Sequence, residues 1–186
     1  IAALTTTQVA ALSTSQAAKL STDQVAALGT AQVKALETTD LANLTTDAVK
    51  SMSSTQVAAL STDQVVALST SQTAKLSSAA VAGLTSAQVG ALETTDLTQL
   101  STDAVRALTT SALGGLTTTQ VGKLTTDQVA ALTTTQVAAL STDQVAALGT
   151  TQVSKLTTEQ VAALGTSQVK ALETIDFASL TTDAVA

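Results

Sequence analysis

Residues 125–132 read Thr-Thr-Asp-Gln-Val-Ala-Ala-Leu, and octapeptides close to this one follow each other along the whole chain without insertion or deletion. The last residue of the unit is the most regular. It recurs at every eighth position from Leu4 to Leu180, and 22 of these 23 residues are Leu while the other is Met52. A strict short period predicts a repeat architecture, in which each unit packs mainly on its neighbours.

We number the unit from the residue after each Leu, so that octad 1 spans 5–12, octad 16 spans 125–132 and octad 22 spans 173–180. The composition suits a thin interior: 45% of the 186 residues are hydrophobic, but they include one Phe and no Tyr or Trp. Large aromatic side chains dominate most globular cores. We therefore expect one continuous solenoid over residues 1–186 and, because the chain starts and ends within a repeat, an excerpt of a longer array.

Charge and residue types argue against several classes of function. The net charge is −6, and neither a basic cluster nor an aromatic platform is present, so no nucleic-acid partner is expected. No apolar run approaches the length of a membrane span, which predicts no membrane insertion. The chain has no His and no Cys, so its many Ser residues lack a base to activate them. We expect no enzymatic activity, no catalytic, cofactor-binding or metal-binding residue, and no cofactor.

The octad fits a short helix better than a long helix or a strand. Eight residues in two turns would need about 4.0 residues per turn against 3.6 in an α-helix, so the apolar stripe of a continuous helix would drift by roughly 80° per repeat. Gln-Val-Ala-Ala-Leu also lacks the alternation of a strand. A capping box marks the restart in many octads, as in Ser21-Thr22-Asp23-Gln24, where Ser21 caps the helix and Gln24 reaches back to the Ser21 amide.

A second phasing fits the same residues. Position 2 is always Thr or Ser, whereas position 1 also accepts Glu and the glycines Gly29, Gly149 and Gly165. Position 2 could then be the cap, with position 1 as a left-handed residue that closes the preceding helix. The two phasings differ by one residue, and the sequence leaves both open.

On either phasing, positions 1, 4, 5 and 8 share a face that we expect to be buried, with positions 3, 6 and 7 opposite. Positions 6 and 7 accept Lys19, Lys34, Lys50, Lys75, Arg106, Lys123, Lys155 and Lys170. These patterns predict an all-α solenoid of short one-to-two-turn helices, one per octad, around a Leu/Val core. We expect roughly three or four octads per coil and, at a helix spacing of about 8–10 Å, a rod roughly 50–80 Å long.

Three octads carry Glu at position 1 and Asp at position 4, and each precedes an octad with Asp at position 3. Glu and Asp oxygens are ligands for hard divalent cations. We weighed a weak cation site against a capping variant spread by segmental duplication and favour the capping variant, because glycine-containing calcium loops are absent. The residues are Glu37/Asp40 with Asp47, Glu93/Asp96 with Asp103, and Glu173/Asp176 with Asp183.

Two polar series also recur. Position 2 is Thr in 20 of 23 octads, for example Thr22, Thr62, Thr102 and Thr142. Such a lattice could order water or bind a glycan, but we favour the interpretation that these hydroxyls satisfy backbone amides at each turn. The Gln series at position 4 could form amide ladders between coils, although its capping role already explains it.

Uninterrupted runs such as Leu124-Thr-Thr-Asp-Gln-Val-Ala-Ala-Leu132 and Leu140-Ser-Thr-Asp-Gln-Val-Ala-Ala-Leu148 resemble the Thr/Ala-rich octad arrays of very large secreted bacterial surface proteins of the adhesin or RTX-like type. The resemblance covers the whole chain. It implies an extracellular stalk or filament segment at the bacterial cell surface, with a role in adhesion or a biofilm matrix and an unknown adhesive target. The Gly/Asp nonapeptides of RTX proteins are absent, so calcium-dependent folding is not implied.

Three functions follow as hypotheses. The leading one is a structural spacer, a rod that links or projects other domains. The second is a filament subunit that associates end to end, because solenoids normally need polar caps at their ends and neither end here differs from the interior. The third is an ice- or glycan-binding module that uses the Thr lattice.

Overall fold

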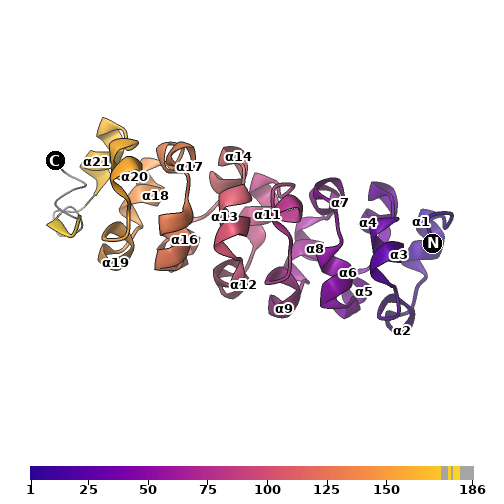
Figure 1. Cartoon of the computed structure of the whole chain (residues 1–186). Helices are drawn as coiled ribbons and strands as arrows, with labels where there is room; N and C mark the ends of the chain where they lie inside the picture. Colours follow the sequence, from indigo (N-terminus) through magenta and orange to yellow (C-terminus); the bar gives the residue numbers. More distant parts are fainter. Residues whose placement is uncertain (173–175, 177, 181–186) are drawn as a thin grey trace.

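The computed structural model describes residues 1–172, 176 and 178–180. Over these residues the chain forms 21 short α-helices and no strands, wound into an elongated coil with α1 at one end and α21 near the other (Figure 1). Each helix has four to six residues, and each of octads 1 to 21 contains one. The predicted all-α solenoid with one helix per octad is therefore confirmed.

The helices follow one another at a constant interval along the chain. They are α1 (Thr6–Ala10), α2 (Thr14–Ala17), α3 (Thr22–Ala26), α4 (Thr30–Ala35), α5 (Thr38–Asn43), α6 (Thr46–Lys50), α7 (Ser54–Ala59), α8 (Thr62–Val66), α9 (Thr70–Thr73), α10 (Ser78–Val81), α11 (Ser86–Ala91), α12 (Thr94–Gln99), α13 (Thr102–Ala107), α14 (Thr110–Leu113), α15 (Thr118–Lys123), α16 (Thr126–Ala131), α17 (Thr134–Ala138), α18 (Thr142–Ala146), α19 (Thr150–Val153), α20 (Thr158–Ala162) and α21 (Thr166–Ala171).

Position 1 is the helix cap, so the first of the two phasings is confirmed. In octad 16 the Thr125 hydroxyl accepts a hydrogen bond from Gln128 N at 3.1 Å, and Gln128 Oε1 accepts one from Thr125 N at 2.9 Å. The alternative phasing is wrong, because position 1 is extended rather than left-handed. Even Gly29 has φ −72° and ψ 161°, and no positive φ occurs in the described part of the chain.

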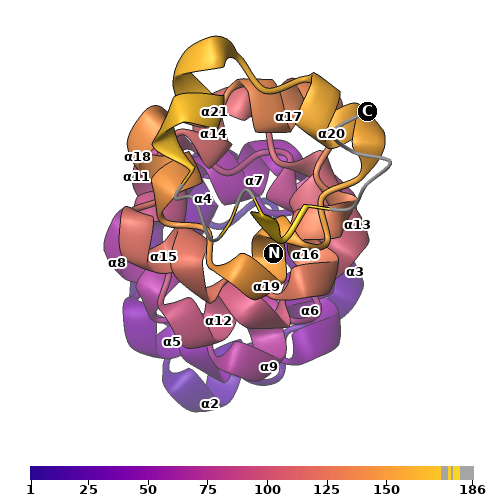
Figure 2. The ribbon, with the colours of Figure 1, turned by 90° about the vertical axis from the view of Figure 1, so that its left-hand side faces the viewer.

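The coil takes between three and four octads, as expected. Each helix packs on the helix three octads later, for example α3 on α6 and α4 on α7. Side chains also reach back 28 to 31 residues, which is the distance to the octad four places earlier. Figure 2 shows the result end-on: the short helices form a ring around a common axis.

Positions 5 and 8 form the core that lines this axis. Val129 is fully buried and Leu132 is 4% exposed, and the same series continues along the rod. Two predicted orientations are wrong. Position 1, predicted on the buried face, is mostly exposed, because its backbone leaves the preceding turn to start the next helix. Position 7, predicted to face solvent, is often half-buried, because it lies against the backbone of the octad three places earlier.

Candidate functional site

The most extensively bonded side chains of the rod are the position-4 glutamines. Beyond its capping bond to Thr125, Gln128 donates from Nε2 to the carbonyl oxygens of Leu97 and Leu100, both at 2.9 Å. One buried amide thus ties a helix cap to two carbonyls of the neighbouring coil. The same two-carbonyl bridge is made by Gln56, Gln64, Gln72, Gln88, Gln120, Gln136, Gln144, Gln152, Gln160 and Gln168.

This arrangement corrects the amide ladder considered from the sequence. The partners of each Gln Nε2 are backbone carbonyls at positions 5 and 8 of another octad, not other Gln amides. In the first coil, Gln8, Gln16 and Gln24 are exposed and make only the capping half of the interaction. The equivalent glutamines of the interior coils are buried because the preceding coil covers them, whereas these three lie at the open N-terminal end of the rod.

The threonines at position 2 do not cap the helices, so the interpretation favoured from the sequence is wrong in this detail. The amide-accepting hydroxyls belong to position 1, as in Ser21 and Ser61. The position-2 residue instead offers its carbonyl oxygen to the next coil: the hydroxyls of Ser51 and Ser179 donate to the carbonyl oxygens of Thr22 and Thr150.

In the three Glu/Asp octads the position-4 Asp is buried, and the described carboxylates do not gather into a cluster. Asp40 is 1% exposed and Asp96 is 3% exposed, whereas Glu37 and Glu93 are exposed. No group of three or more His, Cys, Asp or Glu side chains placed to hold a metal ion occurs among the described residues. The carboxylates of octads 5, 6, 12 and 13 therefore do not assemble the cation site considered above. Glu173, Phe177 and Asp183 lie outside the described residues.

The buried Asp side chains stand where other octads have Gln, and a carboxylate cannot donate to the carbonyls that Gln bridges. Oδ2 of Asp40 and Oδ1 of Asp96 are buried without a hydrogen-bond partner. Asp176 differs, because the Thr150 hydroxyl donates to its Oδ1 at 2.7 Å. Burial, and second the negative charge of Glu37, raise the pKa of Asp40 above its usual value.

This raised pKa predicts a pH-dependent gain from Asp40→Asn. A group whose pKa is higher in the folded state contributes stability below its unfolded pKa, and that contribution is lost as the pH rises through the folded pKa. We expect Asp40→Asn to be more stable than the parent at pH 7, with the difference shrinking toward pH 4. Urea unfolding from pH 4 to pH 7 measures it. Asp23→Asn, an exposed first-turn control, should show no such gain at pH 7, and equal profiles for both variants would contradict the prediction.

A third unpartnered polar atom lies within the core at Thr73. This residue occupies position 5, where most octads have Val, and its hydroxyl is fully buried without a partner. An unsatisfied buried hydroxyl costs about 1–3 kcal/mol. We expect Thr73→Val, which keeps the shape, to raise the free energy of unfolding by about 1 kcal/mol in urea titrations. Thr70→Val, at an exposed position of the same helix, should leave the urea midpoint nearly unchanged.

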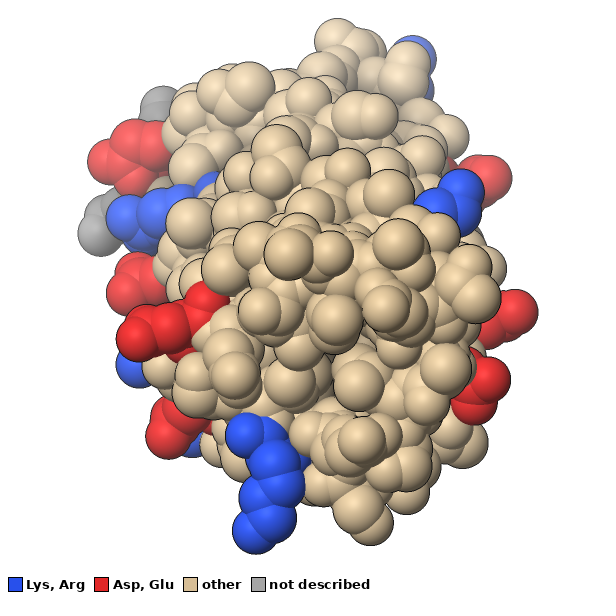
Figure 3. All heavy atoms as spheres, turned by 90° about the vertical axis from the view of Figure 1, so that its right-hand side faces the viewer, with Lys and Arg blue, Asp and Glu red and all other residues tan. Residues whose placement is uncertain are grey.

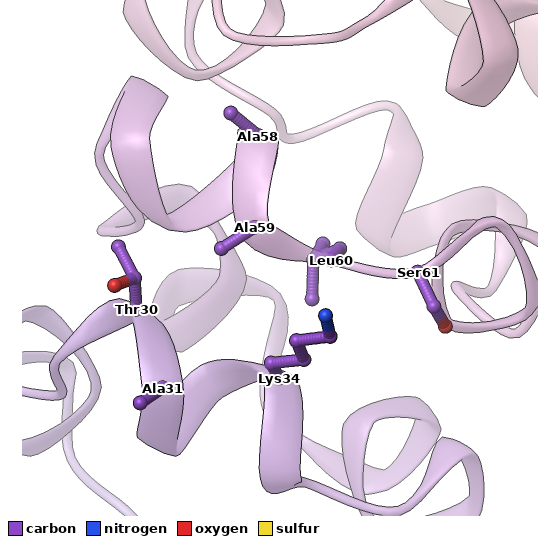
Figure 4. A pocket seen from close by; sticks show the side chains of 7 residues that line it. All are labelled: Thr30, Ala31, Lys34, Ala58, Ala59, Leu60 and Ser61. Carbon is purple, nitrogen blue, oxygen red and sulfur yellow. The ribbon is translucent and has the colours of Figure 1, made fainter.

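A shallow depression of about 440 Å³ lies between α4 and α7 (Figure 4). Thr30, Ala31 and Lys34 line one side, and Ala58, Ala59, Leu60 and Ser61 line the other. Lys34 is the one charged residue of this lining, which contains no carboxylate and no imidazole. At the N-terminal end of the rod the Lys, Arg, Asp and Glu side chains lie around the rim, and none of them covers the centre (Figure 3).

No helix among the described residues has the length and apolar character needed to cross a bilayer. The short capped helices, the Leu/Val axis and the regular bonds between coils define an α-helical repeat protein. The chain belongs to the ALTTAQ repeat family, whose model matches residues 1–30, 33–70, 89–126, 123–158 and 138–174. The family's hexapeptide corresponds here to stretches such as Ala131-Leu-Thr-Thr-Thr-Gln136, which run from position 7 of one octad to position 4 of the next. The comparison with curated proteins yields no significant match.

Proposed function

We propose that this chain is a structural repeat segment, without catalytic activity, that forms a rod or stalk in an extracellular bacterial surface protein. The observation that carries the proposal is that the residues that recur most regularly in the octad all have a role in building the coil. Leu and Val fill the axis, position-1 hydroxyls cap the helices, and each interior Gln joins two coils. Each added octad makes the rod longer. A rod of this kind suits a spacer between a domain that adheres to a target and a domain that anchors the protein to the cell.

Electron microscopy of the purified chain over a concentration series tests this proposal. A spacer predicts short rods whose length is the same at every concentration. Removal of seven octads, such as residues 109–164, should shorten the rods and keep their width. Compact particles of no fixed length would overturn the proposal. Attachment of the chain to a bacterial surface would be tested separately, by labelling intact cells with an antibody against the octad.

End-to-end association is a second candidate, favoured by the first coil. Gln8, Gln16 and Gln24 leave their Nε2 donors free, and no Lys, Arg, Asp or Glu side chain covers the centre of this end. A last coil of another copy could offer the carbonyls that these donors bridge inside the rod. Filaments that lengthen with concentration would support association, and Gln8→Ala with Gln16→Ala should then shorten them.

A third candidate is binding of ice or a glycan by the position-2 threonines. It gains support from the finding that these hydroxyls are not used as helix caps. Thermal hysteresis, or glycan binding by the isolated chain, would support it. A chain that shows neither activity would exclude this function for the segment.

A further inference from the structure

The glutamine bridges between coils are interrupted most extensively at one place in the middle of the rod. Gln88 joins octad 11 to octad 7, and Gln120 joins octad 15 to octad 11. Between these two, position 4 is Asp96, Ala104 and Ala112 in three successive octads. No side-chain hydrogen bond of the described residues joins 65–84 to 93–116. Since one coil takes between three and four octads, nearly a full coil lacks these bridges.

Two of the three unpartnered buried side-chain atoms of the described residues lie on this same interface. Thr73 Oγ1 belongs to octad 9, on one side of it, and Asp96 Oδ1 belongs to octad 12, on the other. The helices that carry them, α9 and α12, pack together. The third atom, Asp40 Oδ2, lies in a shorter interruption of two octads, octads 5 and 6.

Apolar packing across the interface is intact. Leu76, Leu84, Leu100 and Leu108 are all buried, and α10 packs closely on α13. The interface lacks side-chain hydrogen bonds between the two coils. Helices of four to six residues are unstable alone, and the stability of a repeat rod is set by the interactions between neighbouring units. Opening should therefore begin where those interactions are weakest.

We propose that the interface between residues 65–84 and residues 93–116 is a built-in opening point of the rod. The rod opens there first and divides into two segments, in which most octads stay bridged by glutamine. In a stalk, this interface would act as the hinge or yielding point under load. The opening itself is a property of the coil and does not rest on the proposed function.

Native-state hydrogen exchange followed by mass spectrometry on the full chain tests this directly. We expect amides of helices α8–α10 and α12–α14 to exchange at least tenfold faster than those of α15–α17, whose octads are bridged by glutamine to the coils on both sides. Equal or slower exchange at residues 65–84 and 93–116 would overturn the proposal. Fraying at the ends of the rod does not affect this comparison, because both regions are internal.

Ala104→Gln should restore one bridge, because its Nε2 would meet the carbonyls of Thr73 and Leu76 at the usual separations of 31 and 28 residues. We expect exchange across the interface to slow at least tenfold. Ala80→Gln is the matched control: it adds the same side chain at a single interruption, facing Val49 and Met52, and should leave exchange at residues 93–116 unchanged. Equal slowing by both variants would show a general effect and contradict the proposal.

A second experiment removes bridges instead of adding one, so that its result does not depend on whether a Gln fits at residue 104. Replacing Gln144, Gln152 and Gln160 by Ala removes three successive bridges to octads 14–16. Exchange at residues 113–132 and 144–160 should then become as fast as at the natural interface. Unchanged exchange there would show that the bridges do not determine where the rod opens.

Discussion

Replacing Leu84 by Asp is expected to lower the free energy of unfolding by about 4 kcal/mol or more. The side chain is 4% exposed at position 8 of octad 10, so the substitution removes a buried Leu and places a charge in the apolar axis. Because stability in a repeat rod is local, the loss of helix should be confined to the coils around this octad. Circular dichroism gives the fraction of helix lost, and hydrogen exchange gives its location.

The matched control for this substitution is Ala82→Asp, at the exposed position 6 of the same octad. It should change the free energy of unfolding by no more than about 0.5 kcal/mol. Loss of all helix in a single step for Leu84→Asp would contradict the local picture and indicate a rod that unfolds as one cooperative unit.

Replacing Gly115 by Ala is expected to cost about 2–3 kcal/mol. A Cβ added here would lie 2.7 Å from Ser86 Cα and still closer to the Ser86 carbonyl oxygen. Both atoms belong to the backbone of the preceding coil, so no change of rotamer relieves the overlap and the coils must separate. Gly83 lies against Ser54 in the same way. In both places the facing position-2 residue is Ser instead of the usual Thr.

The neighbouring Gly114→Ala is a control that differs by one position. Its added Cβ would meet Ser111 O and Thr110 O at 3.5 Å, an ordinary contact, and its backbone is helical. Ala is favoured over Gly in a helix, so this variant should be neutral or more stable by about 0.5 kcal/mol. Urea unfolding of both variants tests the difference, and similar losses would show that the close approach to Ser86 is not the cause.

Local features of the fold were predictable because their signals are local. The helix per octad and the buried Leu series at position 8 follow from a capping box and a strict period, as octad 16 shows. The sequence left the cap open between positions 1 and 2, and the structure places it at position 1. The burial of position 7 was not predictable, because it depends on how closely the backbone of the preceding coil packs against this residue. The close contacts of Gly83 and Gly115 arise 29 residues away in sequence, at Ser54 and Ser86.

The second role of the glutamines was missed although the sequence carries a signal for it. Glu serves as well as Gln in a capping box, yet position 4 is only Gln, Asp or Ala in this chain and never Glu. Only an amide can accept from the cap and donate to carbonyls at the same time. The absence of Glu therefore indicated that the side-chain nitrogen is used.

The bridge made by each Gln is defined by a count along the chain, since its partners lie 28 and 31 residues earlier wherever it occurs. The same separations apply to bridged octads on every side of the coil. When one typical octad is lost or duplicated, every later Gln still finds the carbonyls of a position-5 and a position-8 residue at the same separations. Unequal recombination within the gene can therefore lengthen or shorten the rod by single units, and each product remains able to fold.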